Sequence, residues 1–224
     1  MIIFSNITKE YQTDEGPITV YRNFSDEIND GEFVVVTGES GSGKTTLLKM
    51  LLKETDPQRG DIVVDGQRLS GITKKQIPLY RRSIGVVFQD FKLIPDLSVY
   101  DNLYVSILAT GGAGNDAMHK ITNVLTMLGI DHLHKRFPKE MSGGEQQKVC
   151  LARAIINNPK ILLVDEPTGN LDPAASIEIN RLLQVINDQG ITIVMATHDM
   201  MALGAKNRRR INLDSIKNKQ CKGA

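Results

Sequence analysis

The chain has 224 residues, of which 41% are hydrophobic and 24% are charged. This balance excludes a globally disordered chain and fits one globular domain with room for a smaller inserted lobe. Lys and Arg number 27 against 26 Asp and Glu, Trp is absent and aromatic residues make up 5%, so neither the basic surplus nor the stacking surfaces of a dedicated nucleic-acid binder are expected.

The apolar runs of the sequence are short. The longest, residues 33–36 and 161–164, fall far below the roughly 20 residues that cross a bilayer. The first residues, MIIFSNITKEY, have neither the basic start nor the long apolar run of a signal peptide. Cys150 and Cys221 are too few and too far apart to predict a disulfide framework. We therefore expect a cytosolic protein that works at a membrane only through a partner.

The first part of the chain shows the pattern of strands. Residues 2–7, 18–28 and 61–65 are enriched in β-branched residues or alternate in part between apolar and polar. Residues 33–37, FVVVT, form a continuous β-branched run, which is typical of a strand buried on both faces of a parallel sheet. A helix is expected over residues 45–53, directly after this run.

Two later runs, ILLVD at 161–165 and ITIVMAT at 191–197, repeat the buried-strand pattern, and each follows a helix-like stretch. The core is therefore expected to be α/β and built of strand–helix units. Between residues 90 and 158 no comparable run occurs, which indicates a mostly helical lobe inserted into this core. Within it a helix over 115–129 is predicted from the spacing of Met118, Ile121, Val124, Leu125 and Leu128.

The end of the chain, residues 206–224, carries many charges. It is expected to fray, as chain ends do when nothing holds them. For Arg208, Arg209 and Arg210 a solvated face is favoured, and contact with a membrane surface is the alternative.

Residues 38–45, GESGSGKT, match the phosphate-binding pattern G-x-x-x-x-G-K-[ST] in full and lie between a predicted buried strand and a predicted helix. The three glycines allow a backbone that turns its N–H groups toward a phosphate, and the start of the helix adds a positive end. We expect Lys44 to reach the β- and γ-phosphates of a nucleotide and the Thr45 hydroxyl to ligate Mg²⁺.

A second motif, an acidic strand end, narrows the choice among the reactions of P-loop proteins. ILLVDEP at 161–167 is an apolar strand that ends in two acids. Asp165 is placed to hold Mg²⁺ through water, and Glu166 to polarise the attacking water as a general base. A P-loop alone also fits nucleotide kinases, GTPases and helicases, but the sequence has no NKxD base-reading segment and no evident Arg-rich lid.

Further segments resemble the motifs of the ATP-binding-cassette (ABC) ATPases. MSGGEQQK at 141–148 is similar to the LSGGQ signature, and GNLD at 169–172 to the D-loop. Gln89 in VFQD resembles the Q-loop glutamine, His198 in VMATHD the switch histidine, and Tyr11 the aromatic that stacks on adenine. Because these motifs, the P-loop and the acidic strand end occur in family order over about residues 1–200, the chain is identified as a member of the ABC family.

The resemblance implies an ABC-type P-loop NTPase fold of the α/β class, with a RecA-like core, an N-terminal antiparallel β-subdomain and an inserted α-helical subdomain. The whole chain, 1–224, is then one ATP-binding domain. The core and the β-subdomain are expected over about 1–89 and 159–210, and the helical subdomain over about 90–158. Met141, Lys148 and Cys150 depart from the residues that relatives usually carry in and after the signature.

The resemblance also implies a homodimer in which each P-loop faces the signature of the other copy, so that ATP joins the two until hydrolysis removes the shared γ-phosphate. The roles that it assigns are as follows: ATP binding by Tyr11, Gly38, Glu39, Ser40, Gly41, Ser42, Gly43, Lys44, Thr45 and Thr46; catalysis by Glu166, His198 and Gln89; Mg²⁺ binding by Thr45, Gln89 and Asp165; a signature acting in trans through Ser142, Gly143, Gly144 and Glu145; and a D-loop contact by Asp172.

Within the ABC family the segments RRSIGVVFQDFKLIPDLSVYDN (81–102) and DEPTGNLD (165–172), together with Glu145 where most relatives have Gln, resemble the FtsE family of cell-division ATPases. This implies a peripheral ATPase on the cytoplasmic face of the cell membrane, which acts through an integral partner resembling FtsX on peptidoglycan hydrolases. The alternatives are the ATPase of a lipoprotein-release or macrolide-export transporter, a soluble ABC protein of ribosomes or DNA, and an assembly module that hydrolyses ATP slowly.

Overall fold

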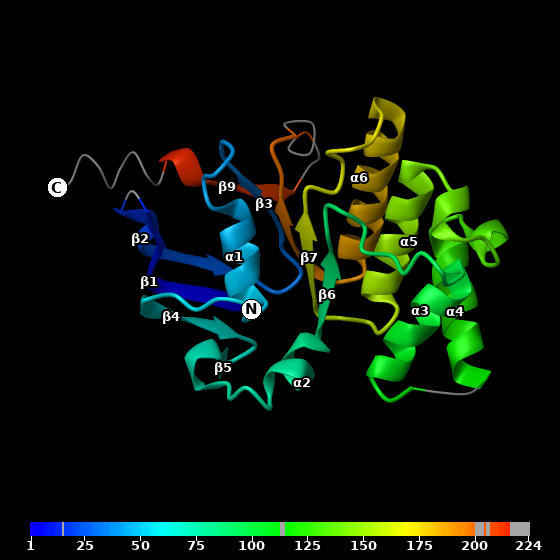
Figure 1. The fold of residues 1–224 in the computed structure, drawn as a ribbon, viewed down its shortest axis with the longest axis horizontal. Helices are drawn as coiled ribbons and strands as arrows, with labels where there is room; N and C mark the ends of the chain where they lie inside the picture. The colour runs from blue at the N-terminus through cyan, green and yellow to red at the C-terminus, as the bar shows by residue number, and fades with distance from the viewer. Residues whose placement is uncertain (15, 113–114, 200–203, 205–206, 216–224) are drawn as a thin grey trace. The chain divides into compact units, whose positions relative to one another are not determined.

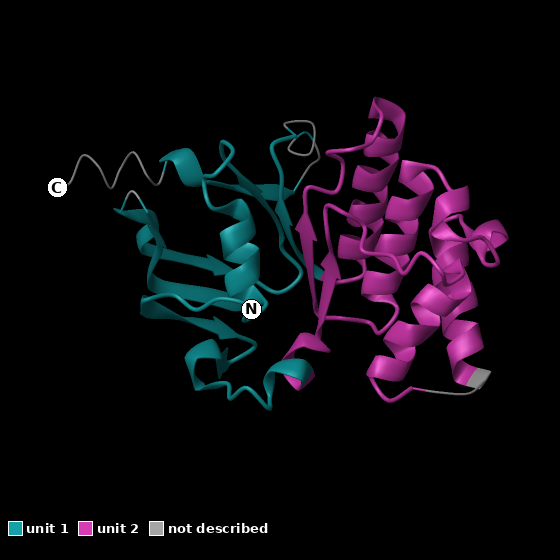
Figure 2. Cartoon of the chain, in the orientation of Figure 1, with its two compact units in different colours: residues 1–78, 192–224 teal, residues 79–191 magenta. Residues whose placement is uncertain are grey.

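The computed structural model describes residues 1–14, 16–112, 115–199, 204 and 207–215. Two compact units divide the chain: Met1–Pro78 with Thr192–Ala224, and Leu79–Ile191 (Figure 2). Cys221, for which no disulfide is expected, lies outside the described residues, and so does the last part of the predicted tail. Among the described residues, none of the helices is both long and apolar enough to span a membrane.

The first unit contains an antiparallel sheet in the order β2-β1-β4-β5 (Figure 1). Its strands are β1 (Ile2–Thr13), β2 (Gly16–Ile28), β4 (Arg59–Val64) and β5 (Gln67–Arg68). They form because apolar side chains recur on one face, and Ile2, Phe4 and Ile7 of β1 are 0–1% exposed. The sheet confirms the strands predicted at the start of the chain.

The same unit contains three parallel strands, β3 (Phe33–Thr37), β8 (Thr192–Ala196) and β9 (Arg208–Asn212). β3 lies between the other two, with Val34 opposite Val194 of β8 and Arg209 of β9. Every residue of β3 and β8 is buried, as the continuous β-branched runs predict. Helix α1 (Lys44–Leu51) follows β3 and contacts β8.

β9 overturns part of the prediction for the charged end of the chain. Arg208 lies over the ring of Phe33, 4.1 Å from its centroid, and Arg210 Nε donates to Thr37 Oγ1 at 2.8 Å. The guanidinium groups of Arg208 and Arg210 therefore contact side chains of β3 and do not face only solvent. A strand made of RRRIN was missed because strand patterns are read from apolar residues.

The second unit pairs β6 (Ile84–Val87) with β7 (Ile161–Asp165) in parallel, with Ile84 opposite Ile161. Its main helices are α3 (Val99–Ala109), α4 (Asn115–Met127), α5 (Gly143–Ile155) and α6 (Pro173–Asp188). Helix α5 contacts α3, α4, α6 and β6, so the other elements of the unit gather around it (Figure 1). Shorter helical segments among the described residues include η1 (Leu69–Gly71), α2 (Ile77–Arg81), η2 (Asp131–Leu133) and η3 (Pro138–Glu140).

Helix α4 confirms the predicted helix but shifts its apolar face. Ile121, Leu125 and Leu128 are 1–3% exposed, whereas Met118 is 63% exposed. Ala117, at 1%, occupies the buried position that the prediction gave to Met118, because 117, 121, 125 and 128 keep the spacing of one helix face. The second unit joins this helical region with β6, β7 and α6, and the predicted subdomain boundaries stay a prediction.

We predict that Arg209→Ala destabilises the protein, because it removes the ion pairs of β9 with Asp26 (2.9 Å) and Glu32. With the side chain 36% exposed, the expected loss is about 1–2 kcal/mol, or roughly 2–8 °C in the thermal midpoint. Arg181→Ala, at an exposed position of α6, is the control. Equal midpoints for the two variants, measured by circular dichroism, would show that β9 is not held by these pairs.

Candidate functional site

The predicted phosphate-binding loop lies between β3 and α1. Gly43 is the N-cap of α1 and has a φ of 110°, and no side chain caps the helix there. A Cβ on Gly43 would lie 2.4 Å from Val20 Cγ1, so only glycine fits. The Tyr21 hydroxyl donates to the Gly43 carbonyl at 2.8 Å and so holds the end of the loop in place. The start of α1 therefore has the positive end of its helix dipole and no capping side chain, which is the arrangement that suits an anion.

Two polar side chains of the loop also suit an anionic ligand. Lys44, 8% exposed, donates from Nζ to the carbonyls of Gly38 (2.8 Å) and Glu39 (3.2 Å), which holds its ammonium inside the loop. The Ser42 hydroxyl is buried and has no hydrogen-bond partner among the described residues. Because an unsatisfied buried hydroxyl costs about 1–3 kcal/mol, a phosphate oxygen in the loop would remove a penalty as well as neutralise a charge.

Asp214 is a support of the loop that sequence reasoning missed. Asp214 lies two residues beyond β9, and its carboxylate accepts the backbone N–H of Glu39 at 3.2 and 3.1 Å. Tyr21 was missed as well. Burial, with a smaller contribution from Tyr11, raises the pKa of Tyr21, so its hydroxyl stays protonated and able to donate. Neither residue belongs to a recognisable local pattern, because each reaches the loop only through the fold.

The other predicted residues of the first unit are exposed. Tyr11 is 39% exposed on β1, with the Lys9 ammonium 4.9 Å from its ring centroid. His198 is exposed two residues beyond β8, where the Asp199 N–H donates to Thr197 Oγ1 at 3.0 Å. Both side chains are accessible to a ligand, and their predicted roles stay predictions.

In the second unit, Gln89 and Glu166 come together. Glu166 follows β7 with a φ of 45°, a left-handed conformation that costs a residue with a Cβ about 1–2 kcal/mol and is typical of functional sites. Gly169 lies beside both, since a Cβ on it would be 3.9 Å from Gln89 Nε2 and 3.9 Å from Glu166 Cβ. Asp165 ends β7 just before them. An amide and two carboxylates therefore lie at the ends of two paired strands, β6 and β7.

The signature segment opens α5. Ser142 is its exposed N-cap and accepts the Glu145 N–H at 3.3 Å, while Glu145 Oε2 accepts the Ser142 N–H (2.7 Å) and hydroxyl (2.8 Å). These bonds, the backbone one first, lower the pKa of Glu145. The helix start is thus ordered and exposes further N–H groups with its positive end.

The signature packs against the D-loop within the same unit. A Cβ on Gly143 would lie 3.3 Å from Leu171 Cδ2, and one on Gly144 would lie 3.2 Å from Ala175 Cβ. Asp172 is the N-cap of α6 and accepts the Ala175 N–H at 2.9 Å. The two glycines therefore let two helix starts approach each other closely.

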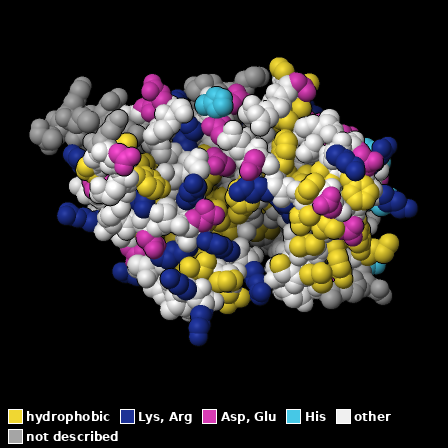
Figure 3. All heavy atoms as spheres, in the orientation of Figure 1, with side chains coloured by type: hydrophobic (Ala, Val, Ile, Leu, Met, Phe, Trp, Pro, Cys, Tyr) yellow, Lys and Arg dark blue, Asp and Glu magenta, His cyan; other side chains and the backbone are white. Residues whose placement is uncertain are grey.

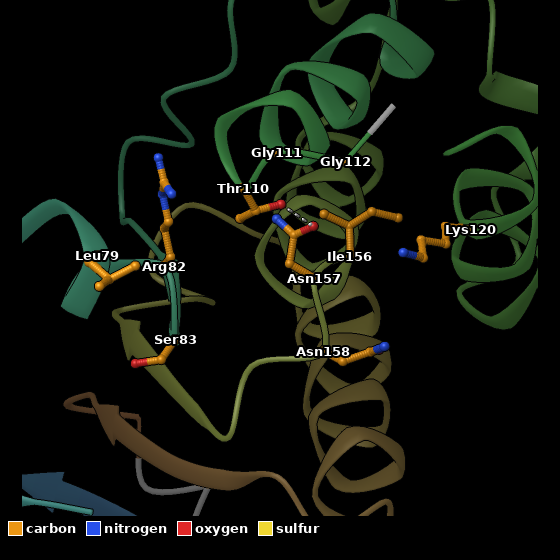
Figure 4. Close-up of a pocket in the computed structure, with 10 residues that line it drawn as sticks. All are labelled: Leu79, Arg82, Ser83, Thr110, Gly111, Gly112, Lys120, Ile156, Asn157 and Asn158. Carbon is orange, nitrogen blue, oxygen red and sulfur yellow. Dashed lines mark hydrogen bonds between the residues drawn. The ribbon is translucent and has the colours of Figure 1, made fainter. Parts of the chain in front are cut away.

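The predicted residues fall into two groups. The first unit carries Tyr11, residues 38–46 and His198, and the second carries Gln89, Asp165, Glu166, residues 142–145 and Asp172. A cavity of about 610 Å³ in the second unit contains none of them (Figure 4). It is lined by Leu79, Arg82, Ser83, Thr110, Gly111, Gly112, Lys120, Ile156, Asn157 and Asn158. The candidate site is therefore built on the loops and helix starts, not on this cavity.

Comparisons with known proteins give matches over most of the chain. The ABC transporter family model matches residues 21–169. Curated proteins named cell division ATP-binding protein FtsE are 43% identical in Streptococcus pneumoniae, 40% in Bacillus subtilis and 38% in Escherichia coli K12. These matches cover 96%, 96% and 95% of this chain, and 92%, 92% and 95% of the relatives.

Two solved structures are also similar. A dimeric bacterial ABC transporter cassette has a TM-score of 0.84 and 32% identity, covering 95% of each chain. A dimeric cassette in a post-hydrolysis state with bound ADP and phosphate has a TM-score of 0.81 and 35% identity, covering 90% of each chain.

We predict that Gly43→Ala abolishes ATP binding, because the new Cβ must displace Val20 at a backbone conformation that alanine rarely adopts. Gly71→Ala is the control, since a Cβ there meets nothing within 4 Å. Fluorescent-nucleotide titration should show a dissociation constant at least about 100-fold weaker for the first variant and unchanged for the second. Equal affinities would reject the phosphate-loop assignment.

Proposed function

The chain belongs to the ABC transporter family and, by identity along nearly its whole length, to the FtsE cell-division ATPases, and from this premise we propose how its residues hydrolyse ATP and pass the resulting motion to a membrane partner. The α/β ABC fold and the activity of an ATPase follow from that membership. The protein is the ATPase subunit of a cell-division complex of the FtsEX type.

In the proposed site the nucleotide binds to residues 38–46. The observation that carries this proposal is the loop before α1, in which Gly43 caps the helix without a side chain, the Lys44 ammonium is held inside the loop and the Ser42 hydroxyl is buried without a hydrogen-bond partner among the described residues. Lys44 would turn from the carbonyls of its own loop to the phosphates. Tyr11, exposed on β1, is the candidate for stacking on adenine.

Hydrolysis is assigned to the residues at the end of β7. Glu166 would accept the proton of the attacking water. Gln89, whose side-chain amide lies near Gly169 as Glu166 does, would orient that water. His198 would hydrogen-bond the γ-phosphate. Thr45, Gln89 and Asp165 supply the hydroxyl, amide and carboxylate oxygens that suit Mg²⁺. When bound, this ion neutralises phosphate charge.

The second half of each site would come from another copy of the chain. Ser142 is exposed at the start of α5, where N–H groups and the helix dipole favour an anion. Gly143, Gly144 and Glu145 would approach the nucleotide of the partner copy, and Asp172 would contact its P-loop. Dimeric relatives of the same fold support this arrangement.

An apolar surface on α3 supports docking of a membrane partner. Val105 and Leu108 are 41% and 48% exposed, and Tyr100 stacks on Tyr104 with their ring centroids 6.0 Å apart. Hydrophobic side chains gather over α3 and α4 in Figure 3. Exposed apolar clusters of this kind are typical of protein interfaces. We assign this surface to the cytoplasmic part of an FtsX-like integral partner, which would hold the chain at the cytoplasmic face and pass its motion to peptidoglycan hydrolases outside.

We predict that Glu166→Gln retains ATP binding, lowers turnover at least about 100-fold and accumulates an ATP-bound dimer, because the amide cannot accept the proton of the water. Phosphate release and size-exclusion chromatography with Mg²⁺ and ATP measure the two effects. Wild-type turnover in this variant would remove Glu166 from the reaction.

The matched controls separate the two halves of the site. In the Glu166→Gln background, adding Ser142→Arg should keep ATP bound to a monomer, whereas adding Lys44→Ala should lose the nucleotide. An undiminished dimer with Ser142→Arg would reject the contact between copies.

We also predict that Val105→Asp prevents co-purification with the membrane partner while basal ATP hydrolysis stays within about twofold, because a charge in the centre of an apolar contact is costly to desolvate. Val185→Asp on α6, at the same 41% exposure, is the control. Loss of the partner in both variants or in neither would exclude the α3 surface.

A further inference from the structure

The loop after β6 is fastened to the signature helix. Arg153 of α5 donates from Nη2 to the Phe91 carbonyl at 2.7 Å and from Nη1 to the Lys92 carbonyl. The Cys150 thiol, one turn earlier on the same helix, donates to the Phe91 carbonyl at 3.1 Å. Two neighbouring carbonyls of one loop are thus held by one helix, two residues after Gln89.

The backbone of this loop is strained. Phe91 and Lys92 have φ values of 56° and 49°, the left-handed region that residues with a Cβ avoid. Two consecutive residues persist there only when their surroundings hold them. The turn is closed locally by the Phe91 N–H, which donates to Phe88 O at 3.3 Å, and the Lys92 ammonium lies 4.4 Å from the Phe88 ring centroid. The Lys92 N–H also donates to Asp90 O, and further restraint comes from α5.

Arginine suits this task better than any other side chain. Its planar guanidinium stays charged and presents several donors in a fixed fork, so it can bind two carbonyls at once. Burial lowers the pKa of Arg153, because desolvation disfavours the charged form of its guanidinium. Within the described residues it forms no ion pair with a carboxylate, so its donors serve the loop.

One helix therefore connects two parts of the proposed site. The N-cap of α5 is Ser142, and its last turns hold the loop of Gln89, whose Nε2 lies beside Glu166 at Gly169. We propose that Arg153 is a positioning residue that sets the place of Gln89 and makes its loop move together with the signature helix. This inference rests on the proposed function, in which Gln89 and Ser142 act on ATP.

The kinetic test uses the full-length chain with Arg153→Lys and Arg153→Gln. Lysine keeps the charge but loses the planar fork that donates from two separate nitrogens, and glutamine keeps part of the stem. Because the P-loop is untouched, KM for ATP should stay within about twofold while kcat falls about tenfold or more, since a displacement of about 1 Å can cost up to about 100-fold. Arg181→Gln, exposed on α6, should change neither constant.

The structural test uses the buried thiol as a reporter. Cys150 is 0% exposed and burial raises its pKa to about 12, so a maleimide should label it slowly while the loop covers it. With Cys221→Ser in every chain, both Arg153 variants should label at least about tenfold faster than the parent, at a temperature where circular dichroism shows all chains folded. The lysine variant keeps this comparison available if the glutamine variant does not fold.

The outcomes separate this inference from the proposed function. Labelling as slow as in the parent, or fast labelling with unchanged kcat, would overturn the positioning role of Arg153. If Glu166→Gln turned over ATP like the wild type, the proposed chemistry would fail, whereas the labelling rates would still decide whether Arg153 holds the loop. Fast labelling with lowered kcat and constant KM is the result expected.

Discussion

The proposed function depends on one interaction, the attraction of an anion to the N-terminal ends of helices α1 and α5. Each helix opens with a residue that has no bulky side chain, Gly43 or Ser142, and each begins with the positive end of its helix dipole. Such ends are stabilised by an anion. A triphosphate between the α1 start of one copy and the α5 start of another would satisfy both, and its loss of the γ-phosphate would remove the bond between the copies.

Strained backbone conformations occur in the loops that would respond to the binding of ATP and the loss of its γ-phosphate. Glu166, Phe91 and Lys92 all have left-handed backbones, and all three lie in loops that follow the parallel strands β7 and β6. A conformation that costs free energy in one arrangement can be relieved in another, so a modest difference in ligand contacts is enough to shift the population. Arg153 connects one of these loops to the signature helix. Chemistry at Glu166 and motion at α5 are thus adjacent in one unit.

Much of this could be predicted from sequence, because local rules determine it. The buried strands β3, β7 and β8, the loop of residues 38–45 and the capped start of α5 follow from β-branched runs, glycine spacing and the serine at a helix start. The supports of the loop could not be predicted. Tyr21 and Asp214 reach it from distant positions in the chain, and β9 is built from arginines that pair with their neighbours. Such contacts exist only after the chain has folded.

The central claim, that ATP joins two copies head to tail, is tested most directly by cross-linking between differently tagged chains. Both carry Glu166→Gln and lack the native cysteines, and one carries Ser40→Cys in the P-loop and the other Ser142→Cys in the signature. A short bifunctional thiol reagent should join the two tags when Mg²⁺ and ATP are present and not with ADP. Cross-linking that is absent with ATP, or independent of the nucleotide, would contradict the account.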